Sequence, residues 1–205
     1  ALEKEVIIIH CCGFESIPSD LGTFLTVKQL DSDNIEVINL IKTKGKISGG
    51  TWASFINSIN KKNSLISQGP RKNKRKVVKK IFYSKEYKSW AMLFPVIDKY
   101  IIMKSAAAFK SYGKNLTFNQ YMLFPSLWQI LILATGVFIV SILSRSKSIK
   151  RFLLNLIPSG SGPTSKQRDS HWFKSIIIGT TKTSKVTTII SGKDPGYGET
   201  AKFIS

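Results

Sequence analysis

The chain has 205 residues, enough for one domain with a hydrophobic core or for one and a half small ones. It carries 31 Lys and Arg against 12 Asp and Glu, so its net charge of +19 favours anionic partners such as lipid headgroups or nucleic acid. The two cysteines, Cys11 and Cys12, are adjacent, which excludes a disulfide framework. The two histidines, His10 and His171, are far apart in sequence, which argues against a zinc site.

The first forty residues predict the order strand, turn, helix, strand. A short apolar run, residues 6–12, indicates a buried strand. The turn after it leads to a helix that begins near Pro18, because proline suits the first turn of a helix. Residues 35–41 indicate a second strand. One face of the helix is expected to carry Leu21, Phe24 and Leu25.

The next part combines an amphipathic helix with a basic stretch. Residues 48–51 (Ser-Gly-Gly-Thr) predict a loop, and large apolar side chains then recur at helical spacing at Trp52, Phe55, Ile56 and Ile59. Residues 61–90 are basic and weakly patterned, so we expect an exposed excursion. Its run 71–80 holds seven Lys and Arg in ten residues. A solvated loop and a contact with anionic lipid both stay open, whereas the lack of aromatic side chains for base stacking makes a nucleic-acid partner unexpected.

A long apolar segment follows, since residues 115–144 contain no charged side chain. Its most apolar part, residues 122–143, would form a helix about 33 Å long, comparable with a hydrocarbon core of about 30 Å. Basic residues flank it on both sides, so charge assigns no orientation. A spanning helix, a re-entrant hairpin and an in-plane anchor remain open, and the alternative without a membrane is a buried core helix.

The last fifty residues predict ordinary globular structure. Residues 159–163 form a Gly- and Ser-rich linker, residues 172–178 and 185–191 predict a hairpin, and residues 191–198 lead into a final helix. The sequence contains no G-x-G-x-x-G dinucleotide fingerprint, no P-loop and no nucleophile elbow. Residue spacing alone therefore assigns no reaction.

Five segments, in order along nearly the whole chain, resemble the saccharopine dehydrogenase-like oxidoreductases. The longest covers residues 11–22 and is similar to the family signature C-G-F-D-S-I-P-S-D-L-G, with Glu15 in place of the usual Asp. The other four are short: Ser48-Gly-Gly-Thr51, the segment 94–103 with Asp98, Gly162-Pro-Thr-Ser-Lys-Gln-Arg168, and Asp194-Pro-Gly-Tyr-Gly-Glu-Thr-Ala201. Lys104 stands where the family usually has Arg.

The resemblance implies an α/β (α+β) fold, a mixed sheet with flanking helices that forms the second domain of a Rossmann-type reductase, plus one long apolar helix or hairpin. The chain begins with Ala1 and its last residues resemble a helix cut short, so we expect the C-terminal portion of a longer protein, without its N-terminal Rossmann half. The expected divisions are the end of a Rossmann domain (1–30), the first part of the α+β domain with a basic excursion at 61–90 (31–114), an apolar membrane or lipid-surface segment (115–151) and the rest of the α+β domain (152–205).

The resemblance also implies site residues near the carboxyl ends of strands, where open α/β sheets bind ligands. The predicted cofactor-binding residues are Gly13, Phe14, Ser16 and Asp20, and the predicted substrate-pocket residues are Gly49, Gly50 and Thr51. The same residues also suit turns and helix starts, and that alternative stays open. The full-length protein would use NAD(P), but this chain is not expected to bind it because the phosphate-binding loop is absent. No catalytic residue and no metal site are predicted.

Animal members of this family carry an apolar segment at the corresponding place and are associated with lipid droplets, mitochondria and membranes, and a bacterial branch acts as an enoyl reductase in lipid and glycolipid synthesis. The resemblance therefore implies a cytosol-facing protein of a membrane, lipid droplet or mitochondrion, with anionic lipids as partners. The implied activity is an oxidoreductase acting on lipid or acyl substrates, with this fragment inactive by itself. The second hypothesis is a catalytically silent protein of a droplet or membrane surface, and nucleic-acid binding through residues 71–80 is the weakest.

Overall fold

The computed structural model describes residues 10–14, 16–59, 78–94 and 97–204. The chain divides into two compact units, each assembled from separate stretches of sequence. The first unit consists of residues 1–44, 94–122 and 170–205, and the second consists of residues 45–93 and 123–169.

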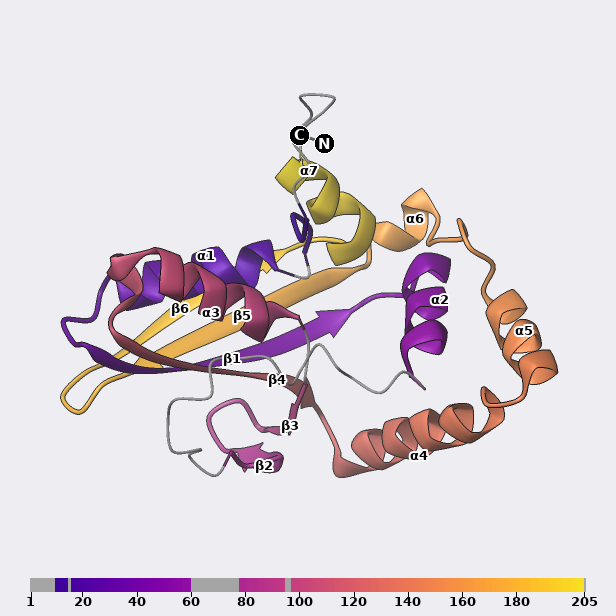
Figure 1. The fold of residues 1–205 in the computed structure, drawn as a ribbon, viewed down its shortest axis with the longest axis horizontal. Coiled ribbons are helices and arrows are strands. Elements are labelled where there is room, and N and C mark those ends of the chain that lie inside the picture. Colours follow the sequence, from indigo (N-terminus) through magenta and orange to yellow (C-terminus); the bar gives the residue numbers. More distant parts are fainter. Residues whose placement is uncertain (1–9, 15, 60–77, 95–96, 205) are drawn as a thin grey trace. The chain divides into compact units, whose positions relative to one another are not determined.

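Four strands form the mixed sheet of the first unit in the order β4-β1-β5-β6 (Figure 1). Their bounds are β1 Asn34–Lys44, β4 Asn115–Phe124, β5 Trp172–Thr180 and β6 Lys185–Gly192. Strand β1 runs parallel to β4 and antiparallel to β5, and β5 and β6 form a hairpin. The predicted α/β class with a mixed sheet and flanking helices is therefore confirmed, as are the strand over residues 35–41 and the C-terminal hairpin.

Two helices cover one face of this sheet, as Figure 1 shows. They are α1 (Ile17–Val27) and α3 (Asp98–Ala108), and a 3-10 turn, η3 (Lys110–Tyr112), follows α3. Beyond β6 the chain forms a π-helical turn, η4 (Pro195–Glu199), and helix α7 (Thr200–Ile204). The hydrophobic core lies between the sheet and these helices and consists of Val27, Leu30, Ile35, Val37, Ile102, Tyr112, Leu116, Phe118 and Ile177.

Helix α1 buries small and polar residues instead of its leucines. Of the predicted apolar face, Phe24 packs against the core, but Leu21 and Leu25 are 52% and 50% exposed, so the prediction is wrong for the two leucines. The buried side is formed by Pro18, Ser19, Gly22, Thr23, Thr26 and Val27. The reason is distance: a Cβ added at Gly22 would lie 2.2 Å from Cδ1 of Ile177 on β5. Only small side chains let the helix come this close to the sheet.

Five buried polar side chains from five different elements form a network beneath α1. The list is Ser19 on α1, Asn39 on β1, Asp98 on α3, Gln120 on β4 and Ser175 on β5. The amide of Asn39 donates to Ser19 Oγ (3.1 Å) and its carbonyl accepts from Ser175 Oγ (2.7 Å). The carboxylate of Asp98 accepts from Gln120 Nε2 (2.7 Å) and Ser19 Oγ (3.2 Å). The network therefore fixes both helices in one register on the sheet.

The second unit contains helices and one short hairpin. Its elements are α2 (Gly49–Ser58), β2 (Ile81–Ser84), β3 (Ser89–Leu93), α4 (Leu127–Leu143), α5 (Lys147–Leu156) and α6 (Ser165–Arg168). Helix α2 packs on α5, where the indole N–H of Trp52 donates to the carbonyl of Leu153 at 2.6 Å. Strand β2 and the first two residues of β3 lie in the stretch 61–90, where the sequence analysis predicted an exposed excursion and no strand.

Two sequence predictions fall wholly or partly outside the described residues. Of the basic run 71–80, only residues 78–80 are described. Of the N-terminal strand predicted over residues 6–12, residues 10–12 are described and form no strand.

The apolar segment is divided between two elements. Residues 122–124 belong to strand β4, and α4 begins at Leu127 and has 17 residues. The long apolar helix predicted over residues 122–143 is therefore not found. Within the part of the chain that the structure describes, no helix has both the length and the apolar character needed to cross a membrane.

Replacing Asn39 tests how much the buried network stabilises the first unit. Asn39→Leu removes the acceptor of the buried Ser175 hydroxyl and a donor to Ser19, so the free energy of unfolding should fall by about 2–4 kcal/mol. The matched control is the exposed Asn34 on the same strand, whose replacement by Ala should change stability by less than about 0.5 kcal/mol. Urea denaturation followed by circular dichroism measures both, and equal effects would contradict a stabilising network.

Candidate functional site

The residues predicted to bind a cofactor form the turn before helix α1. The carbonyl of Gly13 accepts hydrogen bonds from the N–H groups of Ser16 (3.1 Å) and Ile17 (3.0 Å). The N–H of Phe14 donates to Oγ1 of Thr200 at 3.0 Å. The backbone donors at this helix start are thus used within the chain.

A dinucleotide pyrophosphate needs free backbone N–H groups at the start of a helix. The donors around Gly13 already have acceptors, and Pro18, in the first turn of α1, has no N–H. The N–H groups of Phe14, Ser16 and Ile17 are therefore not free to bind a phosphate. The Ser16 hydroxyl is 1% exposed and makes no hydrogen bond to a described residue.

Asp20 contributes to the packing of α1. Its carboxylate accepts hydrogen bonds from Ser105 Oγ and from the Tyr112 hydroxyl, both at 2.8 Å. Burial, followed by the hydrogen bond to Asp20 and the charge of Asp20, raises the pKa of Tyr112 above its ordinary value. Asp20 thus links α1 to α3 and to η3.

The first and last of the five family-like segments meet at one end of the sheet. Besides the hydrogen bond from Phe14 to Thr200, the ring of Phe14 packs edge-on against Phe173 on β5, with 4.5 Å between centroids. Thr200 in turn donates to the carbonyl of Pro195 at 2.9 Å. Phe14 and Thr200, 186 residues apart in sequence, therefore join the two segments at this end of the sheet.

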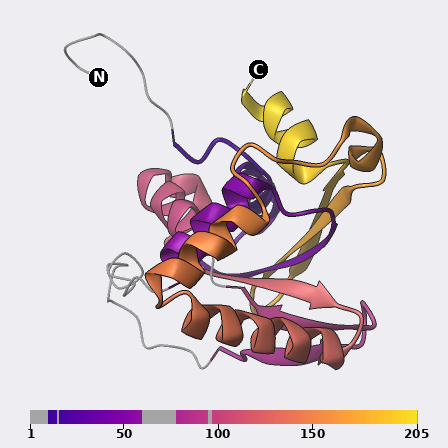
Figure 2. The ribbon, with the colours of Figure 1, turned by 90° about the vertical axis from the view of Figure 1, so that its right-hand side faces the viewer.

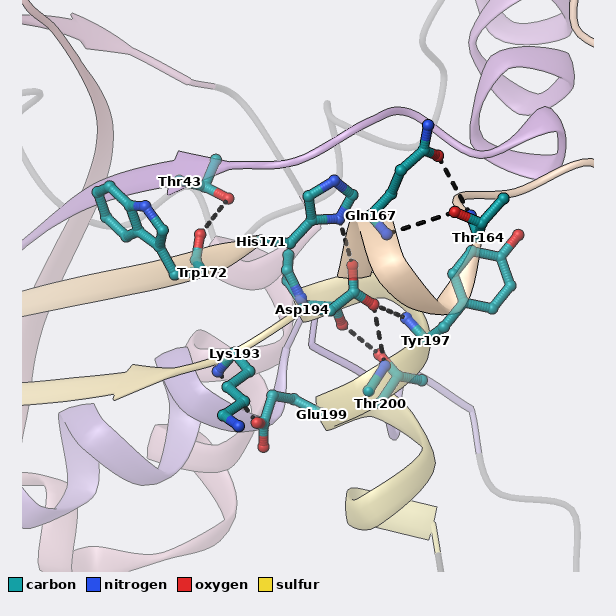
Figure 3. Close-up of polar contacts among 12 residues, drawn as sticks. Thr43, Thr164, Gln167, His171, Trp172, Lys193, Asp194, Tyr197, Glu199 and Thr200 are labelled. Atoms are coloured by element: carbon teal, nitrogen blue, oxygen red, sulfur yellow. Dashed lines mark hydrogen bonds and ion pairs between the residues drawn. The ribbon is translucent and has the colours of Figure 1, made fainter. Parts of the chain in front are cut away.

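A buried pair, His171 and Asp194, lies at this same end of the sheet (Figure 3). Nδ1 of His171 is 2.6 Å from Oδ1 of Asp194, and each side chain is 6% exposed. The other carboxylate oxygen accepts from the N–H groups of Tyr197 (2.7 Å) and Gly198 (3.0 Å). Burial would raise the pKa of Asp194, but the hydrogen bonds from His171 and the two N–H groups outweigh it and lower the pKa.

This pair was missed in the sequence, where His171 stands far from any other candidate ligand. The predicted hairpin contained the needed signal, because Phe173 pairs with Gly192 and continuing that register by two residues places His171 opposite Asp194. A carboxylate that fixes one imidazole nitrogen leaves the other to exchange protons, so the pair can perform acid–base chemistry.

The predicted substrate-pocket residues belong to the second unit and start helix α2. Ser48 caps the helix by accepting from the N–H of Thr51 at 3.1 Å. The N–H of Gly49 donates to the carbonyl of Ser161 at 2.9 Å, and a Cβ at Gly49 would lie 1.9 Å from the carbonyl oxygen of Pro158. Gly49 is therefore needed where two backbone segments touch, and Gly50 has open space around it.

Two other family-like segments also have structural roles. Thr164 and Gln167 form a reciprocal capping box at the start of α6 (Figure 3). Asp98 belongs to the buried network, whereas the ammonium group of Lys104 lies over the Tyr100 ring, 4.8 Å from its centroid. Among the described residues, no group of three His, Cys, Asp or Glu side chains could hold a metal ion.

Helix α4 presents large apolar side chains to solvent. Trp128 and Ile132 are 73% and 70% exposed, and four others on the same helical face are also exposed: Leu131, Phe138, Ile139 and Ile142. Only Ile130 is buried in this helix. A monomeric soluble protein rarely exposes so continuous an apolar surface, which is typical of a binding surface.

Helix α5 follows α4 after a short turn (Figure 2), and its side chains make it amphipathic. Its exposed apolar side chains Ile149, Phe152 and Leu156 recur at helical spacing, and Lys147 and Arg151 lie on the opposite face. This pattern is shared by surface helices of globular proteins and by helices that lie in the plane of a lipid interface.

Comparison with models of protein families, with curated proteins and with solved structures finds no match to this chain. The resemblance to saccharopine dehydrogenase-like oxidoreductases stays a prediction from the sequence.

Alanine substitutions at Gly49 and Gly50 test whether a close backbone contact explains the glycine at position 49. Gly49→Ala forces Cβ against Pro158, so stability should fall by about 1–3 kcal/mol. Gly50→Ala has room and gains helix propensity, so stability should stay equal or rise by up to about 1 kcal/mol. Thermal unfolding measures both changes. Equal losses at the two positions would show that the contact with Pro158 is not the reason why position 49 requires glycine.

The raised pKa of Tyr112 predicts a pH dependence of stability. Because the folded-state pKa lies above the ordinary value of 10.0, the unfolded chain ionises first and the folded state loses stability as pH rises above 10. Tyr112→Phe should lower the free energy of unfolding by about 1–3 kcal/mol at pH 7 and flatten its decline above pH 10. Urea denaturation between pH 7 and pH 11 tests this, and parallel pH curves for the two proteins would refute it.

Proposed function

We propose that this chain is part of a saccharopine dehydrogenase-like oxidoreductase held on a lipid surface by helices α4 and α5. The observation that carries the proposal is the exposed apolar face of α4, followed directly by the amphipathic α5. Both helices belong to the second unit, so the attachment surface is formed by one compact part of the chain.

The free energy available from α4 is sufficient for in-plane attachment. Six large apolar side chains, between 46% and 73% exposed, would release on the order of 5–10 kcal/mol on entering an apolar phase. An in-plane position suits the helix, since its 17 residues span only about 26 Å. The α4 face then lies in the boundary between headgroups and acyl chains.

The basic residues next to α4 define the kind of lipid. Arg145, Lys147, Lys150 and Arg151 follow the apolar helix within eight residues, and none of them forms an ion pair with a described residue. Each Lys or Arg near an anionic membrane contributes about 1 kcal/mol. A surface that contains anionic phospholipids is therefore the proposed partner.

The enzymatic part of the proposal rests on the five family-like segments. It predicts a lipid or acyl substrate in lipid or glycolipid metabolism at a cytosol-facing lipid droplet, mitochondrion or other membrane. The second candidate is a catalytically silent surface protein, favoured by the use of Gly13, Phe14 and Asp20 in packing. A Gly-rich phosphate loop in the same polypeptide favours the enzyme, and its absence from the complete protein favours the silent alternative.

Flotation with liposomes tests the attachment. Ile132→Glu combined with Ile139→Glu places two carboxylates on the α4 face and should lower the lipid-bound fraction about a hundredfold, because about 3 kcal/mol of apolar transfer is lost. The matched control is Leu21→Glu combined with Leu25→Glu. These two leucines of α1 are also about half exposed, but they lie in the first unit and not on the proposed attachment surface. Circular dichroism of both variants establishes that they are folded.

The lipid composition separates the contributions of α4 and the basic residues. Binding to vesicles with phosphatidylserine should exceed binding to neutral vesicles. High salt should reduce this additional, electrostatic binding but leave the apolar binding, which neutral vesicles also show, unchanged. A chain that stays unbound under all conditions, or a control variant that loses binding equally, would overturn the proposal.

A further inference from the structure

The turn that contains Asp194 does not need the contact with His171 to hold its conformation. Asp194 already holds η4 through the N–H groups of Tyr197 and Gly198, and its carbonyl accepts from the N–H of Glu199 at 2.8 Å. Thr200 closes the same turn on Pro195. The turn is therefore fixed by contacts in which His171 takes no part.

The carboxylate of Asp194 is held in its charged form. It accepts three hydrogen bonds, one from the imidazole and two from backbone N–H groups. Such a carboxylate binds the Nδ1–H tautomer of the ring and fixes its orientation.

The second ring nitrogen, Nε2, is left for another partner. Among the described residues, the one hydrogen-bond partner of the ring is Asp194, at Nδ1, and Nε2 has none. A histidine with only a structural role normally uses both nitrogens when its ring is buried. The His171 side chain as a whole is 6% exposed.

The pair lies beside the aromatic contact between Phe14 and Phe173. Phe14 and Phe173 pack together two residues along β5 from His171, and Phe14 is joined to Thr200 just after η4. Figure 3 shows the imidazole and carboxylate between the start of β5 and the turn that follows β6. The cluster thus joins the longest family-like segment to the last one.

We propose that His171 and Asp194 form a proton-transfer pair, in which Nε2 of His171 gives a proton to, or takes one from, the oxygen of a bound carbonyl or alcohol group. Asp194 is the positioning residue, because it acts through the ring and not on the substrate. In one direction the Nε2–H bond breaks and an O–H bond forms on the substrate, and the Nδ1 proton stays in its bond to Asp194. The choice of a carbonyl or alcohol rests on the proposed oxidoreductase function.

Acylation of the imidazole by diethyl pyrocarbonate tests whether Nε2 is available and activated. The chain has only two histidines, so His10→Gln leaves His171 as the single imidazole. Nε2 adds to a carbonyl carbon of the reagent and the ring loses a proton, and the ethyl carbonate that leaves decomposes to ethanol and carbon dioxide. Peptide mass spectrometry at pH 7 gives the rate for the folded chain and for the chain unfolded in urea.

In the folded chain, His171 should react at a rate within about tenfold of the unfolded chain. Asp194→Asn keeps the acceptor for Tyr197 and Gly198 but favours the wrong tautomer, so the folded-state rate should fall by about ten- to a hundredfold while the unfolded-state rate stays equal. Nitrogen NMR of the two imidazole signals checks the tautomer directly. A ring that is protected in the folded chain, or a rate that Asp194→Asn leaves unchanged, would assign the pair a structural role and overturn the proposal. No lipid is present in this assay, so its result is independent of the flotation experiment.

Discussion

The close approach of helix α1 to strand β5 is the constraint on which the first unit depends. Gly22 has no room for a Cβ beside Ile177, and Ser19 lies in a polar network that includes Asp98 and Gln120. Because a helix this close to a sheet cannot bury leucines on its inner side, its core contacts come from small and hydroxyl-bearing residues. The buried hydrogen bonds then specify its register, since any slip would leave several of them unmade.

The second unit has a different physical character. Its helices α2 and α5 pack together through Trp52 and Leu153, while α4 has an exposed face of tryptophan, isoleucine and phenylalanine. Apolar side chains exposed to water at this density raise the free energy of the unit unless an apolar phase or partner covers them. The basic side chains of α5 supply the charge that suits an anionic lipid surface. Attachment and any acid–base chemistry would therefore depend on separate compact units.

The family-like segments illustrate how one residue pattern serves two purposes. Gly49, Thr164 and Asp20 could each be explained by ligand binding, yet each makes specific contacts within the chain. The pair formed by His171 and Asp194 differs, because the turn around Asp194 is complete without the imidazole. A side chain with a reactive atom beyond its structural contacts is the stronger candidate for chemistry.

The sequence by itself determined the α/β class, the strand over residues 35–41, the C-terminal hairpin and the helix that begins near Pro18, because these depend on local periodicity and turn chemistry. It also identified the apolar segment, but tertiary pairing decided that residues 115–124 join the sheet as β4 beside β1. Only the folded chain decided that Leu21 and Leu25 face water and that His171 meets Asp194. The reason is that helix approach and side-chain pairing depend on residues distant in sequence, whose mutual distances no local pattern contains.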